Sequence, residues 1–120
     1  MWRRRAGSEA KFSNIKTIVD GIRFDSRAEA RQYGVLKMRE KIGEILDLEL
    51  QPSYDLIVNG QKVCSYRADF RYRTTAGDVI VEDVKSAGTM TPVFRLKKKL
   101  MLACLGVEIH LIGVRAKPLK

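Results

Sequence analysis

Polar and hydrophobic residues alternate most regularly in the middle of the chain. Over residues 63–73 the apolar side chains fall on every second position from Tyr66 onward, and charged residues, among them Asp69, fill the positions between. A period of two is typical of a β-strand with one buried face. After a short turn at 74–78, residues 79–85 begin with three consecutive apolar side chains, as expected of a strand that is buried on both faces. The pattern predicts two consecutive strands joined by a tight turn.

Two segments have the sequence features of helices with defined ends. Ser26 and Glu29 have the Ser-x-x-Glu spacing of a capping box, and good helix formers continue to about Lys41. Further along, Thr91 is a suitable N-cap and the proline after it suits a first helical position, and Gly106 supplies the stop signal. We expect one helix from each of these segments.

Three further segments have the composition of strands. Residues 44–50 and 54–58 are separated by a Gln-Pro break, and the second of them ends at Asn59-Gly60, a dipeptide that favours a tight hairpin. Residues 107–114 form the last candidate strand. The order is helix, three-strand meander, helix, strand. We therefore expect an α+β fold, or a three-layer α/β/α arrangement, with the meander at its centre.

The length of 120 residues suits a single domain. We expect residues 1–11 to form a flexible basic arm and residues 12–120 to form the domain. No stretch approaches the ~20 apolar residues of a membrane span, and no apolar signal segment follows the basic start, so a cytoplasmic location is expected. Cys64 and Cys104 lack the neighbours of a zinc site, which favours two reduced cysteines.

The net charge of +9 is distributed unevenly along the chain. Residues 1–16 carry +4 and residues 94–120 carry +6, so the middle of the chain carries −1. Basic ends around a centre that holds most of the carboxylates suit a protein that binds a polyanion and keeps an acidic pocket for a divalent cation. A basic surface without any partner is the plainer explanation, and the isoelectric point favours nucleic acid over it.

Candidate chemistry lies on the two consecutive strands. Asp83 and Lys85 are two residues apart and project from the same face of their strand, and a meander brings Asp69 beside Asp83. Two adjacent carboxylates repel each other unless a proton or a cation lies between them, and Mg²⁺ prefers such oxygen ligands. In the alternative structural interpretation, Asp69 pairs with Arg67 or Arg71, and Asp83 pairs with Lys85.

Other hydrolytic chemistries lack their residues. His110 is the only histidine, so the chain cannot supply a two-histidine nuclease mechanism, and a Ser-His-Asp hydrolase would depend on His110 alone. Its alternation with Glu108 on the last predicted strand favours a solvated position.

Several short motifs together resemble a known family. They are the string Val-Asp-Gly-Ile-Arg-Phe-Asp-Ser-Arg-Ala-Glu-Ala at 19–30, Leu-Gln-Pro at 50–52, Ala-Asp-Phe at 68–70 and Val-Glu-Asp-Val-Lys at 81–85. The combination is similar to small phage and prophage endonucleases of the PD-(D/E)xK superfamily, which is restriction-endonuclease-like and has an αβββαβ core. The match covers residues 12–114. One departure is Ala68, where the superfamily name has proline.

The resemblance implies roles for individual residues. It implies that Asp69 and Asp83 bind metal, that Lys85 assists catalysis, and that Glu29 completes the site. The capping box explains Glu29 without catalysis, but Glu29 shares a helical face with Tyr33, which packs toward the sheet, and this favours a role in the site.

The second helix carries a further candidate, Lys97. The apolar stripe expected on this helix consists of Val93, Leu96, Leu100 and Cys104, with Phe94 and Met101 at its border. Lys97 falls inside that stripe, and related nucleases often place a polar residue of this helix beside the active site. Lys98 and Lys99 are expected on the opposite, solvated face, where they contact DNA together with Arg3, Arg4 and Arg5 of the arm.

The expected activity is that of a Mg²⁺- or Mn²⁺-dependent endonuclease that cuts DNA. The resemblance implies a role in phage recombination or replication on branched DNA such as a Holliday junction, and a homodimer, because resolving a four-way junction requires two cuts. Two alternatives stay open: a catalytically inactive DNA-binding module with the same fold, and a structural or assembly protein.

Overall fold

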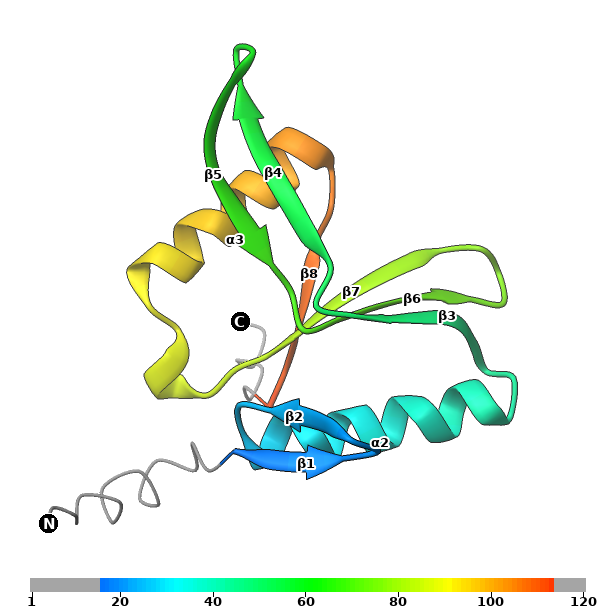
Figure 1. The fold of residues 1–120 in the computed structure, drawn as a ribbon. Helices are drawn as coiled ribbons and strands as arrows, with labels where there is room; N and C mark the ends of the chain where they lie inside the picture. The colour runs from blue at the N-terminus through cyan, green and yellow to red at the C-terminus, as the bar shows by residue number, and fades with distance from the viewer. Residues whose placement is uncertain (1–15, 114–120) are drawn as a thin grey trace, which may run out of the picture.

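The computed structural model describes residues 16–113 and is built around a four-stranded mixed sheet (Figure 1). Its strands are, in spatial order, β3 (Ile45–Leu50), β6 (Phe70–Thr74), β7 (Val79–Val84) and β8 (Ile109–Ile112). The first three are antiparallel neighbours, and β8 runs parallel to β7. The sheet and two helices make an α+β fold, which confirms the predicted class.

The two helices begin and end close to where the sequence predicts. α2 (Arg27–Lys41) is capped by Ser26, whose hydroxyl accepts the N–H three residues further on at 3.1 Å. α3 (Pro92–Leu105) is capped by Thr91 in the same way, also at 3.1 Å. Gly106 ends α3 with φ of 69°, a left-handed conformation that glycine adopts without the strain of a Cβ atom. Local capping chemistry therefore fixes both helix starts.

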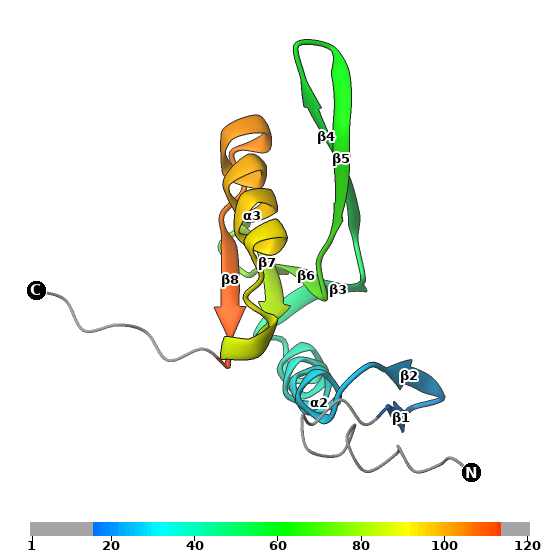
Figure 2. The same cartoon turned by 90° about the vertical axis from the view of Figure 1, so that its left-hand side faces the viewer.

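The predicted strand over 63–73 is wrong as one continuous element. The structure divides it into β5 (Gln61–Arg67) and β6, which lie in different sheets. Among the strands that the structure describes, β5 pairs only with β4 (Ser53–Val58). The turn between them has positive φ at Asn59 and Gly60, as the Asn-Gly signal predicts. This β4–β5 hairpin extends away from the four-stranded sheet (Figure 2).

A bend in two paired segments causes this division. Gln51 and Pro52 separate β3 from β4, and Ala68 and Asp69 separate β5 from β6 at the same level. The backbone pairing continues through the bend, because Gln51 N–H donates to the Asp69 carbonyl at 2.9 Å and Ala68 N–H donates to the Pro52 carbonyl at 3.0 Å. Gln51 has φ of 52°, which turns the chain at this point. The paired strands therefore form one continuous two-stranded ribbon, in which β4 and β5 run in a different direction from β3 and β6.

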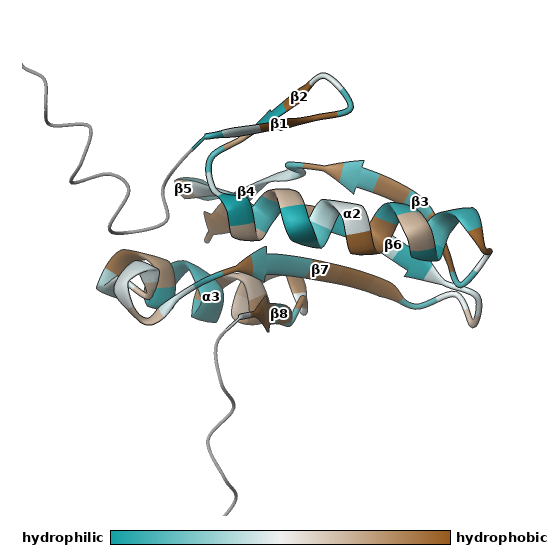
Figure 3. Cartoon of the chain, turned by 90° about the horizontal axis from the view of Figure 1, so that it is seen from below, coloured by the Kyte–Doolittle hydropathy of each residue, from teal (hydrophilic) through white to brown (hydrophobic). Residues whose placement is uncertain are grey.

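The bend divides the core into two clusters. The first contains α2 residues with Phe70 and Tyr72, and the second contains α3 residues with Tyr66 and Ala68. Val81 of β7 belongs to the second cluster, whereas its neighbour on the strand packs against the first. Seen from below, α2 and α3 lie on either side of β7 (Figure 3). Each helix thus covers its own core.

A second hairpin near the N-terminal end was not predicted. It pairs β1 (Thr17–Val19) with β2 (Ile22–Phe24) through Asp20 and Gly21, both with positive φ. Its contacts with α2 include the Phe24 and Tyr33 rings, whose centroids are 5.0 Å apart. The Asp-Gly dipeptide between apolar residues is a recognised hairpin signal, and it was available in the sequence.

The buried side of α3 differs from the predicted stripe. Val93 and Leu96 are 61% and 57% exposed, whereas Phe94 and Met101 are buried. The expected stripe is therefore wrong at Val93 and Leu96, because the helix is rotated so that its predicted border forms the main contact, whereas Leu100 of the stripe packs against the second core. Lys97 stays half-buried, but Lys98 is half-buried as well and does not lie on a fully solvated face.

Parts of the expected organisation fall outside residues 16–113. These are the basic arm at 1–11, including Arg3, Arg4 and Arg5, and the last residue of the predicted strand at 107–114. Within the described residues, neither helix has the length and hydropathy needed to cross a membrane.

The packing of α2 predicts a clear contrast between two neighbouring residues. Leu36 has no exposed surface and lies in the first core, whereas Val35 beside it is 47% exposed. Leu36→Ala should lower the free energy of unfolding by about 2–5 kcal/mol, because it removes packed methyl groups and leaves a cavity. Val35→Ala should change it by less than about 0.5 kcal/mol. Chemical denaturation of both variants checks this, and equal losses would contradict the observed face.

Candidate functional site

Four side chains from three parts of the fold meet at one end of the sheet. Asp69 lies in the bend before β6, and Asp83 lies near the end of β7. The antiparallel register pairs Phe70 with Glu82, so one residue beyond this pair Asp69 comes opposite Asp83. The first turn of α2 adds Glu29, and Lys85 follows directly after β7. These are the site residues that the sequence and the family resemblance pointed to, apart from Lys97.

The site opens into a cleft of about 650 Å³ between the start of α2 and the loop after β7. Glu29, Asp69 and Lys85 line it, whereas Asp83 is not among its lining residues and is only 2% exposed. The remaining lining residues are Asp25, Ser26, Arg27, Ala28, Arg31, Val84, Ser86, Thr89 and Gly113. A smaller cavity of about 130 Å³ touches Glu29 and Asp69 beside β2. The Glu29 and Asp69 carboxyls are therefore reached from solvent through a defined opening.

Asp83 has a partner on each carboxylate oxygen. Tyr66 Oη donates a hydrogen bond to Oδ2, and Lys85 Nζ lies 2.9 Å from Oδ1. The lysine ammonium also lies over the Phe94 ring, 4.4 Å from its centroid, within the range of a cation–π interaction. The structural interpretation of the Asp83–Lys85 pair is thus correct as far as it goes, since the two side chains form an ion pair.

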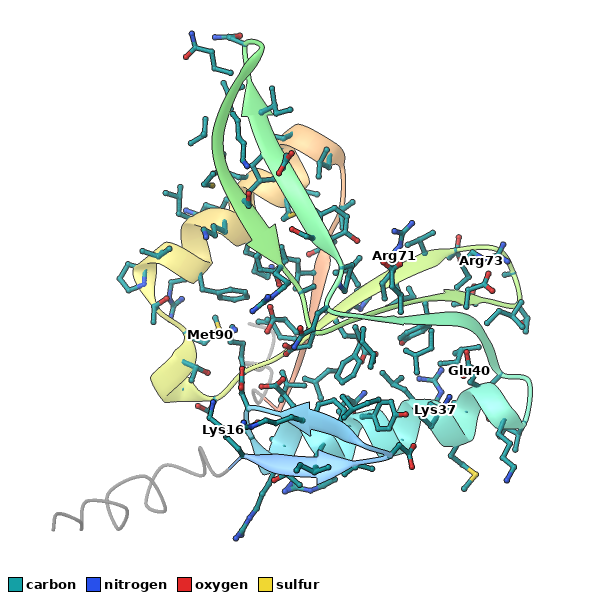
Figure 4. All side chains as sticks on the ribbon, in the orientation of Figure 1. Lys16, Lys37, Glu40, Arg71, Arg73 and Met90 are labelled. Carbon is teal, nitrogen blue, oxygen red and sulfur yellow. The ribbon has the colours of Figure 1, made fainter. Side chains whose placement is uncertain are left out.

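Asp69 has no arginine partner among residues 16–113. Its Oδ2 accepts the Val84 N–H at 2.8 Å. Arg71 instead lies 3.6 Å from Glu49 of β3, and the labelled Arg71 and Arg73 side chains lie along β6 away from the α2 start (Figure 4). The expected alternative in which Asp69 pairs with Arg67 or Arg71 is therefore wrong, and its carboxylate points toward the other acids.

Burial and crowding raise the pKa of Asp69. Desolvation is the largest cause and the nearby Asp83 charge the second, and Glu29 adds to the effect, whereas the hydrogen bond from Val84 N–H opposes it. Together they raise the pKa of Asp69 to about 8. A carboxyl so placed takes up a proton unless a cation neutralises the site.

Glu29 belongs to the same cluster. Its backbone N–H is used by the Ser26 cap, which explains its position in the helix but leaves its side chain free to point toward Asp69. Burial raises the pKa of Glu29 first, followed by the charges of Asp25 and Asp83, whereas Lys85 lowers it. The Glu29 carboxyl therefore interacts electrostatically with Asp83 and Lys85 and through a hydrogen bond with Asp69.

Glu82 lies on the other face of β7, as the alternation predicts. Tyr72 Oη donates to one of its oxygens at 2.6 Å, and Gln32 Nε2 of α2 donates to the other at 2.9 Å. Burial and this carboxylate raise the pKa of Tyr72 to about 12. These contacts give Glu82 a structural role between α2 and the sheet.

The lysines of α3 are separate from the carboxyl cluster. Among the described residues, no hydrogen bond or ion pair joins Lys97 to an acidic side chain. Lys98 and Lys99 line a groove of about 390 Å³ between α3 and β8, together with Met90, Arg95, Leu102, Glu108, Ile109 and Leu111. The structure thus does not bring Lys97 to the other predicted site residues.

A complete metal cage is not preformed in the part of the chain that the structure describes. There, no group of three or more acidic, histidine or cysteine side chains is arranged to hold a metal ion by itself. The thiols of Cys64 and Cys104 are free and half-buried, and His110 is exposed. Any divalent ion at this site would need ligands from water or substrate besides the protein.

Sequence reasoning missed two contributors, Tyr66 and Phe94. It assigned both to packing, because they carry no charge and fall on apolar faces. A signal was present: a buried tyrosine usually finds a hydrogen-bond partner for its hydroxyl, and Asp83 projects from a strand that is buried on both faces. The contacts of the Phe94 ring with Tyr66 and Lys85 depend on how α3 is rotated about its axis, which the sequence does not reveal.

Residues 9–115 match the family described as "Protein of unknown function (DUF1064)". The chain therefore belongs to this family. Comparison with curated proteins and with solved structures found no match.

The raised pKa of Asp69 predicts a pH-dependent stability. The unfolded chain loses the Asp69 proton near its ordinary pKa of 3.8, whereas the folded protein keeps it up to a pKa of about 8. Between these two pH values the folded protein therefore holds a proton that the unfolded chain has already lost. The stabilising contribution of this proton is complete below pH 4 and declines as the pH rises toward 8. Asp69→Asn removes the charge and keeps an oxygen for Val84 N–H. With a chelator present, it should melt several degrees above the wild type at pH 9 and close to it at pH 4.

Melting curves at the two pH values check this prediction. A change of about 1 kcal/mol corresponds to roughly 3–6 °C for a domain of this size. Asp78→Asn, at an exposed carboxyl in the turn between β6 and β7, is the control and should change melting little at either pH value. A pH-independent shift for Asp69→Asn would contradict the crowding of the carboxyls.

The end of β8 constrains the position of Lys85 through a close backbone approach. Gly113 has φ of 95°, and a Cβ atom there would lie 2.9 Å from the Lys85 carbonyl oxygen. Gly77 has nearly the same φ, 96°, but open space around it. Gly113→Ala should therefore cost about 1–3 kcal/mol more than Gly77→Ala, since only the first adds overpacking to the backbone strain. Denaturant titration measures the difference, and its absence would mean that the two segments separate freely.

Proposed function

We propose that this protein is a metal-dependent endonuclease that hydrolyses DNA phosphodiester bonds. The observation that carries the proposal is that Asp69, Glu29 and Lys85 line one cleft and that Asp83 contacts them from its buried side. These surroundings raise the pKa of Asp69 and of Glu29. A purely structural cluster would gain stability from replacing such crowded acids. Their presence favours a role in binding a cation.

The donor set fits a hard divalent ion. Mg²⁺ is usually bound through one or two carboxylates, with waters and substrate phosphates in the other positions, so an incomplete protein cage is what such a site needs. Asp69 and Asp83 would hold the ion with Glu29 beside them, and water or phosphate oxygens would complete the set. When bound, Mg²⁺ or Mn²⁺ supplies charge neutralisation at the phosphate and lowers the pKa of water.

Lys85 supplies the remaining cation of the site. Its ammonium is held by Asp83 on one side and the Phe94 ring on the other, and its side chain lines the cleft. We propose that it orients the scissile phosphate or the attacking water. In the hydrolysis, an oxygen of water bonds to phosphorus, the bond to the leaving oxygen breaks, and that oxygen takes up a proton.

The order of elements supports a restriction-endonuclease-like core. α2, β3, β6, β7, α3 and β8 follow one another as αβββαβ, with the β4–β5 hairpin inserted after the first of these strands. Three layers are part of the proposal, with α2 and α3 on the two sides of the sheet. The resemblance of residues 12–114 to PD-(D/E)xK nucleases of phages agrees with this order.

The charge distribution supports DNA as the substrate. Arg27 and Arg31 line the same cleft as the carboxyls, and the ends of the chain are strongly basic. Phosphates contact such side chains through charge, independently of base sequence. Branched DNA and a homodimer that makes two cuts remain proposals that rest on the family resemblance.

A comparison of substrates tests the proposal. Four-way junctions, flaps, single strands and duplexes at equal concentration are incubated with Mg²⁺, with Mn²⁺ and with a chelator. We expect cleavage that the chelator stops, with branched DNA cut fastest. Tight binding without any cutting would support the inactive DNA-binding module instead, and neither binding nor cutting would favour a structural protein.

Two adjacent buried acids on β7 provide a matched pair of variants. Asp83→Asn removes the charge on the cleft side, and Glu82→Gln removes it on the α2 side, with exposed fractions of 2% and 4% in the wild type. Asp83→Asn should reduce the cleavage rate at least ~100-fold and leave DNA affinity nearly unchanged, because it removes a metal ligand and little volume. Glu82→Gln should keep the rate. Wild-type cleavage by Asp83→Asn would refute the site.

A further inference from the structure

We propose that Tyr66 is a positioning residue that holds the Asp83 carboxylate in the orientation needed to bind the divalent ion. The inference rests on the proposed function and extends it to a residue that lies on a different sheet. Its basis is the hydrogen bond from Tyr66 Oη to Asp83 Oδ2, made where both side chains are buried.

Without Tyr66, the Asp83 carboxylate would be held mainly by its ion pair with Lys85. Lys85 engages Oδ1, but its long side chain is partly exposed and reaches the carboxylate from the cleft side. Tyr66 is 4% exposed and approaches Oδ2 from the core. A carboxylate oxygen has two lone pairs, so each oxygen keeps acceptor capacity after accepting one hydrogen bond. The phenol therefore fixes the carboxylate plane and still leaves lone pairs for a cation.

The position of Tyr66 is itself fixed by the second core. Its ring lies 6.1 Å from the Phe94 ring, and the Phe94 ring also contacts the Lys85 ammonium. Asp83, Tyr66, Phe94 and Lys85 thus form a closed circuit of contacts. Because Tyr66 belongs to β5, this circuit connects the base of the β4–β5 hairpin with the cleft.

Partners that orient metal ligands have a measurable effect on metal affinity. Removing one typically weakens metal binding about 10–100-fold, because the ligand must then be ordered by the ion itself. A tyrosine with only a packing role would influence stability and leave metal affinity unchanged. Metal affinity therefore separates the two roles.

The chain offers a matched control on the opposite face of the sheet. Tyr72 is 5% exposed and donates from Oη to the buried Glu82 carboxylate at 2.6 Å. Tyr72→Phe thus removes the same group from the same kind of bond, away from the cleft. Any general cost of deleting a buried phenol hydroxyl appears in both variants.

The experiment measures the dissociation constant for Mn²⁺ alone by calorimetry, for the wild type, Tyr66→Phe and Tyr72→Phe, with melting temperatures recorded in parallel. Both variants should melt lower than the wild type. Only Tyr66→Phe should bind Mn²⁺ more weakly, by about 10–100-fold. With DNA as substrate, Tyr66→Phe should have a lower kcat than the wild type at limiting Mn²⁺ and a wild-type kcat at high Mn²⁺. Its KM for DNA should be unchanged.

The outcomes distinguish this inference from the proposed function. If the wild type binds Mn²⁺ and Tyr66→Phe binds it as well as Tyr72→Phe does, the positioning role is wrong and the nuclease proposal stands. If the wild type binds no Mn²⁺, the proposed function itself fails. Should Tyr66→Phe not fold, Tyr66→Met removes the same hydroxyl and keeps an apolar side chain, and an unchanged Mn²⁺ affinity in that variant would also overturn the inference.

Discussion

The bend at Gln51–Pro52 and Ala68–Asp69 is the constraint on which the rest of the structure depends. Backbone hydrogen bonds cross the ribbon at the bend itself, so the pairing is kept while the direction changes. The single apolar face of the ribbon is thereby divided between two cores, and each core requires a helix to cover it. α2 and α3 satisfy this requirement on different sides of β7. Without the bend, Tyr66, Ala68, Phe70 and Tyr72 would all lie on one face of a continuous strand.

The bend also explains why an acidic cluster exists at this point. Asp69 lies outside the regular strands, so its side chain is free to accept the Val84 N–H and to approach Asp83 instead of a cross-strand arginine. The arrangement is unfavourable without a cation, because burial and the neighbouring charge raise the pKa of the carboxyl. Functional sites commonly retain such destabilising arrangements, since the cost is recovered on ligand binding. The nuclease proposal gives a physical reason for a cluster that folding alone does not need.

Local chemistry determined which parts of this fold were predictable. Caps and turn residues act within a few positions, so the bounds of α2 and α3 and the Asn59-Gly60 turn follow from the sequence. The bend at Ala68–Asp69 cannot be predicted in this way. The alternation of apolar and polar residues continues without interruption through it, so the sequence gives no sign that β5 and β6 pack against different cores. The rotation of α3 is likewise set by its neighbours. In the candidate site, the charged residues were predictable from motif spacing, whereas Tyr66 was not, because its role depends on what lies beside its hydroxyl.

Two neighbouring acids of β7 each accept a hydrogen bond from a buried tyrosine, and their positions determine what each acid can do. Tyr72 with Glu82 and Tyr66 with Asp83 are both a buried phenol donating to a buried carboxylate. In the first pair Gln32 takes the remaining oxygen, so the acid is enclosed between α2 and the sheet and serves packing. In the second pair the remaining oxygen faces Lys85, whose side chain lines a cleft shared with Asp69. The alternation of β7 thus sends one acid into a closed polar network and the next toward an opening, and only the second is placed to exchange its partner for an ion from solvent.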